Sequence, residues 1–75
     1  MYRPSSGAAQ RAIRRKVLRT LRNGPESAAM VGAATGYEFS PIHHTLRKLR
    51  DLGLVIQRED DGRWELTDAG RESLG

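Results

Sequence analysis

The sequence predicts a mainly helical α+β domain in which three helices are followed by a β-hairpin and a short C-terminal helical turn. Three observations support this fold class. Apolar residues recur at helical spacing through most of the chain before the predicted hairpin. An Asp-Gly turn then separates two short β-prone segments, and glycine or proline marks the predicted boundaries. At 75 residues the chain has room for a single small domain.

The first helix is expected over residues 9–22, after a flexible tail over residues 1–8 that carries proline, serine and glycine. Apolar residues at steps of four form its inner face. They are Ile13, Val17 and Leu21. Asn23-Gly24-Pro25 ends the helix, because proline cannot continue it. The folded domain is therefore expected over residues 9–75.

The second helix is expected over Ala28–Thr35. Ser27 precedes it as an N-terminal cap, and Gly36 ends it. Val31 and Ala34 are its expected core contacts. Most of its other residues are small, so a neighbouring helix can approach it closely.

The third helix is expected over about residues 40–52, with Ser40 as its cap. Pro41 would take the first helical position, where a missing N–H costs nothing. The spacing of large aliphatic residues predicts a buried stripe, with Thr45 and Leu52 at its margin. The stripe consists of Ile42, Leu46 and Leu49.

The hairpin is expected over about residues 54–66, with Asp60-Asp61-Gly62 at its turn. Trp64 and Leu66 alternate with polar residues, which predicts that both side chains lie on one face. Thr67 can cap the final helical turn.

Basic residues are concentrated near the N-terminus of this chain, whose net charge is +4. Residues 1–25 hold seven basic residues and no acid, whereas residues 26–75 hold six basic and nine acidic residues. A purely basic segment favours a polyanionic partner, nucleic acid before membrane, although a solvated helix face explains it equally well. Four arginines fall on one line of the first predicted helix: Arg11, Arg15, Arg19 and Arg22.

Two segments resemble the winged helix-turn-helix domain of MarR, ArsR and PadR type transcriptional regulators. Residues 36–55 read GYEFSPIHHTLRKLRDLGLV and are similar to the turn, recognition helix and following strand of those regulators. Residues 61–71 read DGRWELTDAGR and resemble their wing and the segment after it. The likeness covers about residues 9–74. It implies a small regulator that binds double-stranded DNA, with the third helix in the major groove and the wing at the backbone.

The resemblance also implies roles for individual residues. Base-reading candidates lie on the face of the third helix away from the buried stripe. They are Ser40, His43, His44 and Arg47. Phosphate-binding candidates lie on the flanks of that helix, on the wing and on the first helix. They are Lys48, Arg50, Arg58, Arg63, Arg11, Arg15 and Arg19.

Three features depart from the family pattern. Glu38 stands where a capping Ser or Thr is usual, and Phe39 stands where a polar base reader is common, so we expect Phe39 to pack against the helix start. The wing tip is acidic, with Glu59, Asp60 and Asp61. The long dimerisation helices of MarR and PadR relatives do not follow the wing, so a homodimer would use the first helix, the tail or the last turn.

Composition argues against several other function classes. The absence of cysteine excludes disulfides, thiolate zinc sites and a cysteine nucleophile. No apolar run approaches the roughly 18 residues of a membrane span, and the N-terminus lacks a signal-peptide core, so we expect a cytoplasmic, nucleoid-associated protein. His43 and His44 diverge by about 100° on a helix and cannot share one metal ion.

We therefore expect no metal, no cofactor and no enzymatic activity, since no nucleophile elbow or phosphate loop is present. The main alternative is a winged-helix interaction module that docks an acidic protein partner through the arginines of the first helix.

Overall fold

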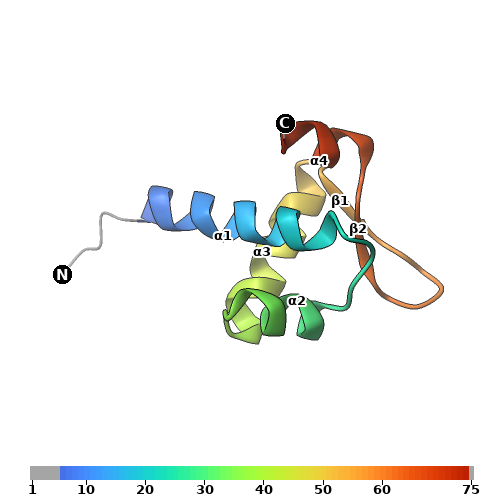
Figure 1. The fold of residues 1–75 in the computed structure, drawn as a ribbon, viewed down its shortest axis with the longest axis horizontal. Coiled ribbons are helices and arrows are strands. Elements are labelled where there is room, and N and C mark those ends of the chain that lie inside the picture. The colour runs from blue at the N-terminus through green and yellow to red at the C-terminus, as the bar shows by residue number, and fades with distance from the viewer. Residues whose placement is uncertain (1–5, 75) are drawn as a thin grey trace.

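The computed structural model describes residues 6–74 of the chain. Its elements follow the predicted order, so the chain has the winged helix-turn-helix fold (Figure 1). They are α1 (Ser6–Leu21), α2 (Ala28–Thr35), α3 (Phe39–Asp51), β1 (Val55–Gln57), β2 (Trp64–Leu66) and α4 (Asp68–Ser73). Within the described residues, no helix is long and apolar enough to cross a membrane.

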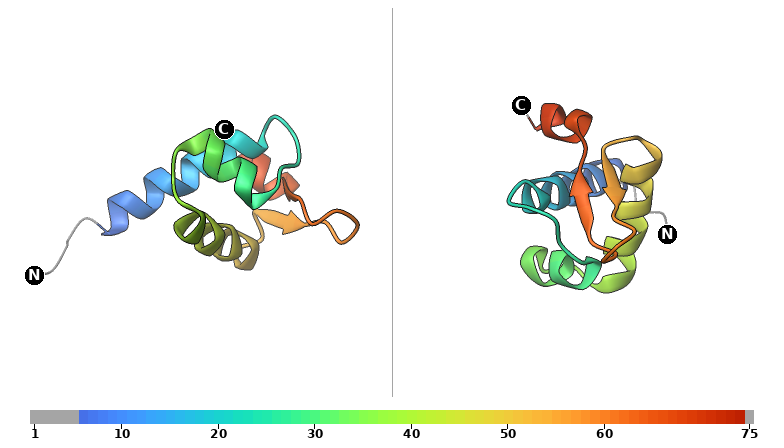
Figure 2. Two further views of the ribbon diagram at one scale, coloured as in Figure 1. Left: turned by 90° about the horizontal axis from the view of Figure 1, so that it is seen from below. Right: turned by 90° about the vertical axis from the view of Figure 1, so that its right-hand side faces the viewer.

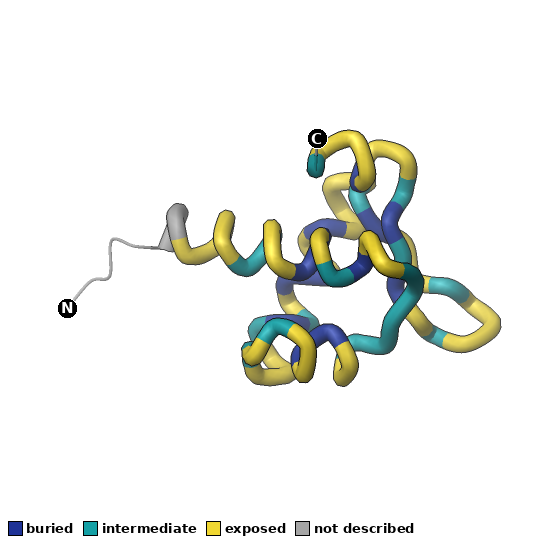
Figure 3. The backbone as a smooth tube through the Cα atoms, viewed as in Figure 1, coloured by how far each residue is buried: buried dark blue, intermediate teal, exposed yellow. Residues whose placement is uncertain are grey.

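α1 starts earlier than the sequence indicated, so the prediction of a flexible tail is wrong for residues 6–8. Alanine has the highest intrinsic helix propensity, and the alanines at positions 8 and 9 favour extension of the helix toward the N-terminus. Residues 1–5, the rest of the predicted tail, lie outside the described residues. The N-terminal half of α1 projects beyond the other helices, whereas its second half is buried against them (Figure 3).

A single hydrophobic core joins the three helices to the hairpin. Its members are Val17, Leu18, Leu21, Val31, Ile42, Leu46, Leu49, Val55, Trp64 and Leu66. The predicted buried stripe of α3 and the predicted common face of Trp64 and Leu66 are confirmed, because all of these side chains are buried. Ile13 is only partly buried and packs at the edge of the core.

Three assignments at the edge of the core are wrong. Ala34 is exposed because α2 meets the core through Val31 and Gly32, and a residue two positions after Gly32 lies on the opposite face. Leu52 is 54% exposed because it caps the end of α3 on the flank. Thr45, expected at the margin, is 2% exposed and belongs to the interior.

The caps of α2 are confirmed, but the predicted cap of α3 is wrong. Ser27 Oγ accepts a hydrogen bond from the Met30 N–H at 3.1 Å, and Gly36 ends α2 in the left-handed region with φ 83°. α3 instead begins at Phe39, and its N-cap Glu38 makes no side-chain capping bond. Pro41 is thus the third helical residue, where its missing N–H is still not required.

The hairpin is anchored to the linker between α1 and α2. β1 and β2 are antiparallel, with Gln57 opposite Trp64 and Val55 opposite Leu66. On its other side Trp64 pairs with Glu26, whose N–H donates to Trp64 O at 3.0 Å while Trp64 N donates to Glu26 O at 2.7 Å. β2 therefore lies between β1 and this linker. The loop that joins β1 to β2 projects from the body as the wing (Figure 2).

α4 is held against the turn that follows α3. Thr67 caps α4 as predicted, because its Oγ1 accepts from the Gly70 N–H at 3.0 Å. The same hydroxyl donates to Gly53 O at 2.7 Å. Gly70 packs so closely on Leu54 O that a Cβ atom there would overlap it. The short α4 is thus fixed both by hydrogen bonds and by steric fit.

Candidate nucleic-acid interface

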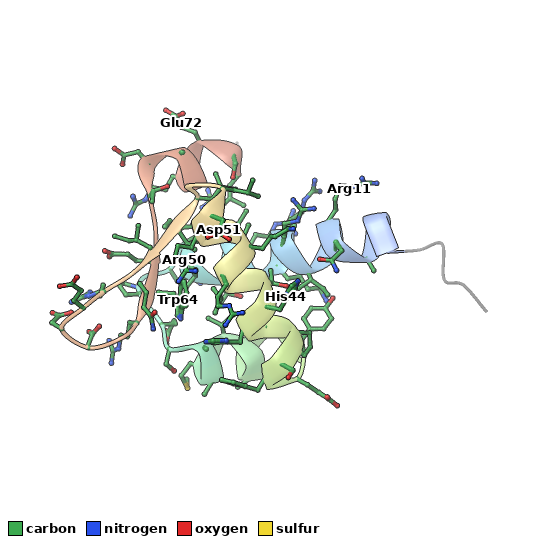
Figure 4. All side chains as sticks on the ribbon, turned by 180° about the vertical axis from the view of Figure 1, so that it is seen from behind. Arg11, His44, Arg50, Asp51, Trp64 and Glu72 are labelled. Carbon is green, nitrogen blue, oxygen red and sulfur yellow. The ribbon has the colours of Figure 1, made fainter. Side chains whose placement is uncertain are left out.

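The outward face of α3 carries polar and basic side chains, as the sequence indicated (Figure 4). Ser40, His44 and Arg47 are all exposed. Neighbouring residues form a shallow hollow along the same face: His44, Arg47, Lys48, Arg50 and Asp51. Figure 4 shows His44 and Arg50 on either side of the helix.

The basic residues of this face differ in their electrostatic partners. Arg50 Nε lies 3.6 Å from Asp51 Oδ1, so part of its charge is balanced within the helix. Among the described residues, no carboxylate lies within 4.0 Å of Arg47 or Lys48. These two side chains therefore present uncompensated charge to the solvent.

His43 does not share the outermost line of α3, and the prediction that it does is wrong. Its ring is half-buried and stacks on Phe39, with centroids 5.3 Å apart and an interplanar angle of 17°. It also meets Trp64 edge-on, with centroids 6.4 Å apart. His43 is thus held on the flank of α3 that faces the hairpin.

Phe39 is a surface residue, which differs from the prediction. We expected it to pack against the helix start, but it is the first residue of α3 and is 59% exposed. The packing prediction assumed that the helix began at Ser40. Because the helix begins one residue earlier, the side chain is turned out of the core.

Acidic residues of the wing engage both of its predicted phosphate-binding arginines. Arg58 Nε lies 3.4 Å from both Asp60 Oδ1 and Asp61 Oδ1. Arg63 Nε lies 3.9 Å from Asp61 Oδ2. The hydrogen bond from Arg58 lowers the pKa of Asp60, and the same bond, together with the charge of Asp61, raises the pKa of Arg58. The wing tip is therefore a small, internally paired ion cluster.

A second basic surface lies on α1, in a groove of about 380 Å³. Four arginines line it: Arg11, Arg14, Arg15 and Arg19. Leucines also line it: Leu18, Leu49, Leu54 and Leu74. Arg22, which the sequence placed on the same line, does not contribute to the groove. The groove shares no residue with the hollow on α3.

The arginines of this groove lack partners in the described part of the chain. No carboxylate there lies within 4.0 Å of a basic residue of α1, whereas Arg50, Arg58, Arg63 and Arg71 all have one. Arg14 Nε is buried without a hydrogen-bond partner. Arg14 was not among the predicted site residues, although its i, i+3 spacing from Arg11 indicates a shared helix face.

Within the described residues, no group of three or more His, Asp or Glu side chains is arranged to hold a metal ion. No titratable side chain on the outward face of α3 lies in an enclosed cavity, since the hollow there is shallow.

Comparison with known proteins gives relatives of two kinds. No family model matches the sequence. Over 40 residues the chain is 48% identical to the HTH-type transcriptional regulator NmtR of Mycobacterium tuberculosis, a match that covers 53% of this chain and 33% of NmtR. The resemblance to helix-turn-helix transcriptional regulators is thereby confirmed.

Two solved structures contain a similar fold. One is PigF with SAH, at 29% identity and a TM-score of 0.71 over 87% of this chain. The other is CalO1, a methyltransferase in calicheamicin biosynthesis in its SAH-bound form, at 38% identity and a TM-score of 0.65 over 85% of this chain. The chain spans 19% of each of those chains and 33% of NmtR. A similar fold thus occurs within a methyltransferase, whereas the sequence is similar to a transcriptional regulator, so function must be argued from the surface residues.

Proposed function

We propose that this chain is a sequence-specific, double-stranded DNA-binding domain of a transcriptional regulator, acting at the nucleoid in the cytoplasm. The observation that carries the proposal is the outward face of α3, where Arg47 and Lys48 are exposed and, among described residues, without a carboxylate within 4.0 Å. The similarity to NmtR supports it. An amphipathic helix with a buried inner face and a basic outer face suits docking in the major groove.

In this proposal α3 reads base edges with three side chains. Arg47 donates two parallel hydrogen bonds to O6 and N7 of a guanine. His44 donates to a purine N7 or a phosphate, and Ser40 contributes a hydroxyl at the start of the helix. His43 is given no base-reading role, because its ring is half-buried on the flank of α3 that faces the hairpin.

Phosphate contacts would position the helix without reading sequence. Lys48 is the main candidate, because no carboxylate among the described residues lies within 4.0 Å of it. Arg50, Arg58 and Arg63 must each exchange a carboxylate partner for a phosphate, so their net contribution is smaller. The three acids of the wing tip repel phosphate, and the wing therefore lies along the backbone rather than deep in the minor groove.

Selection from a random duplex library by the purified chain, at about 150 mM salt, tests this proposal. We expect enrichment of a defined motif that contains guanine. An inverted repeat would indicate two copies bound as a homodimer, and its spacing would give their separation. A single motif would indicate a monomer. Enrichment of no motif over the input library would contradict sequence-specific binding.

A second candidate function rests on the arginine groove of α1. Four arginines without carboxylate partners in the described chain, lying beside leucines, suit an acidic protein segment that also carries apolar residues.

DNA binding by one double variant distinguishes the two proposed functions. Replacing Arg11 and Arg15 with Glu cancels the net positive charge of the four arginines that line the groove but leaves α3 unchanged. If the chain is only an interaction module, the wild type should bind DNA weakly and without preference, and its affinity should fall steeply with salt. The contrary result is a variant that still discriminates the selected duplex from random duplex at about 150 mM salt. That result would count against the chain being only an interaction module.

A further inference from the structure

The exposed ring of Phe39 has no role in the hydrophobic core. It is the first residue of α3 and is 59% exposed, whereas every large side chain of the inner face of the same helix is fully buried. Leaving an aromatic ring in water forgoes the stabilisation that its burial would give. Phe39 lies at the start of α3, on the flank that it shares with His43 and beside the outward face proposed to bind DNA, and it is therefore a candidate contact.

The ring is also held in place by other rings. Phe39 stacks on His43 at 5.3 Å between centroids, and His43 meets Trp64 edge-on at 6.4 Å. Trp64 is 2% exposed, and its backbone pairs with Glu26 as well as Gln57. The three rings form a column from the core to the surface. Phe39 is thus presented on a firm support and loses little side-chain freedom on contact with a partner.

The position of Phe39 in α3 indicates which partner group it meets. Recognition helices place their N-terminal residues against base edges in the major groove. Phe39 directly precedes Ser40 in the first turn of α3. A phenyl ring can neither donate nor accept a normal hydrogen bond, and the one apolar group on the major-groove edges of the bases is the 5-methyl group of thymine.

We infer that Phe39 is a specificity residue that packs against the 5-methyl group of a thymine in the bound duplex. This inference rests on the proposed function. It adds an apolar contact to the hydrogen bonds of Arg47, so the bound site contains a thymine at a fixed distance from the guanine that Arg47 reads. His43 acts as a positioning residue that holds the ring.

A thermodynamic cycle between protein and DNA tests the inference. Each thymine of the selected duplex is replaced in turn by deoxyuridine, which lacks only the methyl group. The dissociation constant of each duplex is measured for the wild type and for Phe39→Ala. At one or two thymines the wild type should lose about fourfold in affinity, the value of one buried methyl group. Phe39→Ala should bind thymine and deoxyuridine equally at those positions.

The matched control is Met30→Ala. Met30 is also a large exposed apolar residue, at 55%, but it lies on α2. This variant should keep the wild-type response to deoxyuridine, and circular dichroism should show that both variants are folded. A selected site without thymine, or deoxyuridine effects that are the same in Phe39→Ala and the wild type, would overturn the inference and leave the proposed function intact. Failure to select any duplex would instead remove the proposed function, and the inference with it.

Discussion

Arg47 and Lys48 are adjacent exposed residues of α3, but they point in directions that differ by about 100°. We expect Arg47→Ala to weaken binding to the selected duplex by about 1–3 kcal/mol and to relax the preference at one base pair. Lys48→Ala should weaken selected and random duplexes alike. It should also reduce the slope of log affinity against log salt by about 0.9. Fluorescence anisotropy over a range of salt concentrations measures both effects.

The two substitutions are controls for each other, because each removes one positive charge from the same face. Equal losses from both on every duplex would contradict the assignment of base reading to Arg47. The interaction would then be electrostatic and independent of sequence.

Gly70 shows how one residue fixes an element. A Cβ atom at this position would overlap Leu54 O and lie 3.1 Å from Leu66 Cδ2. We expect Gly70→Ala to lower the free energy of unfolding by about 1–3 kcal/mol, because α4 must shift away from the hairpin. Denaturant unfolding measures the change. Ala69→Ser, at an exposed position of the same helix, should change it by less than about 0.5 kcal/mol. An equally small effect at Gly70 would show that α4 is not tightly packed.

At the residue scale, helix periodicity predicted the outward direction of His44 and Arg47 correctly, because that direction depends only on the buried stripe. The surroundings of His43 and Phe39 were not predictable in this way. The ring of His43 meets Trp64, which lies on another element far along the chain, and Phe39 was misplaced together with the start of α3. Arg14 was missed because its half-buried position depends on how α1 packs against the rest of the domain.

The N-terminus of α3 can be stabilised directly by a substitution at its cap. Glu38 occupies the N-cap without a side-chain capping bond. Glu38→Ser should raise the free energy of unfolding by about 0.5–1 kcal/mol, because a serine oxygen accepts an N–H of the first turn. The gain is moderated by the loss of a carboxylate that favours the positive end of the helix. Glu38→Ala, which removes the carboxylate without adding a cap, should show no gain in denaturant unfolding. Equal stabilities of the two variants would contradict this account of the cap.

The wing is expected to respond to acid through Asp60. The hydrogen bond from Arg58 lowers the pKa of this carboxyl group. A lowered pKa means that the ion pair contributes fully above the ordinary carboxyl pKa, and its contribution is lost as the pH falls through the lowered value. An NMR titration of the Asp60 carboxyl carbon should show a raised pKa in Arg58→Ala. Arg63→Ala, which removes a partner of Asp61 only, should leave it nearly unchanged. Equal effects of both substitutions would contradict the pairing.

At the element scale, local motifs were predictable and long-range contacts were not. The caps at Ser27 and Thr67 and the end of α2 at Gly36 are short-range features, and the structure has them as expected. The pairing of Glu26 with Trp64 was missed, since it joins two segments distant in sequence. The start of α3 was misplaced because Ser40-Pro41 resembles a helix start on its own.

For the whole molecule, the main feature is the separation of two basic surfaces on one small fold. The outward face of α3 and the groove of α1 share no residue. The charge imbalance of the sequence indicated a polyanionic partner but did not show which of these two surfaces binds that partner. Because a similar fold occurs in two SAH-bound structures, whereas the sequence is similar to the transcriptional regulator NmtR, the fold does not assign the function.

The most direct test of the central claim is an NMR titration of the ¹⁵N-labelled chain with its selected duplex. We expect the largest chemical-shift changes at the first turn and outward face of α3, with smaller changes at the wing. The residues concerned are Phe39, Ser40, His44, Arg47, Lys48 and Arg63. The leucines beside the α1 groove should change little. Changes confined to α1 from Arg11 to Arg19, with α3 unaffected, would contradict DNA reading by α3 and would favour the docking function of the groove.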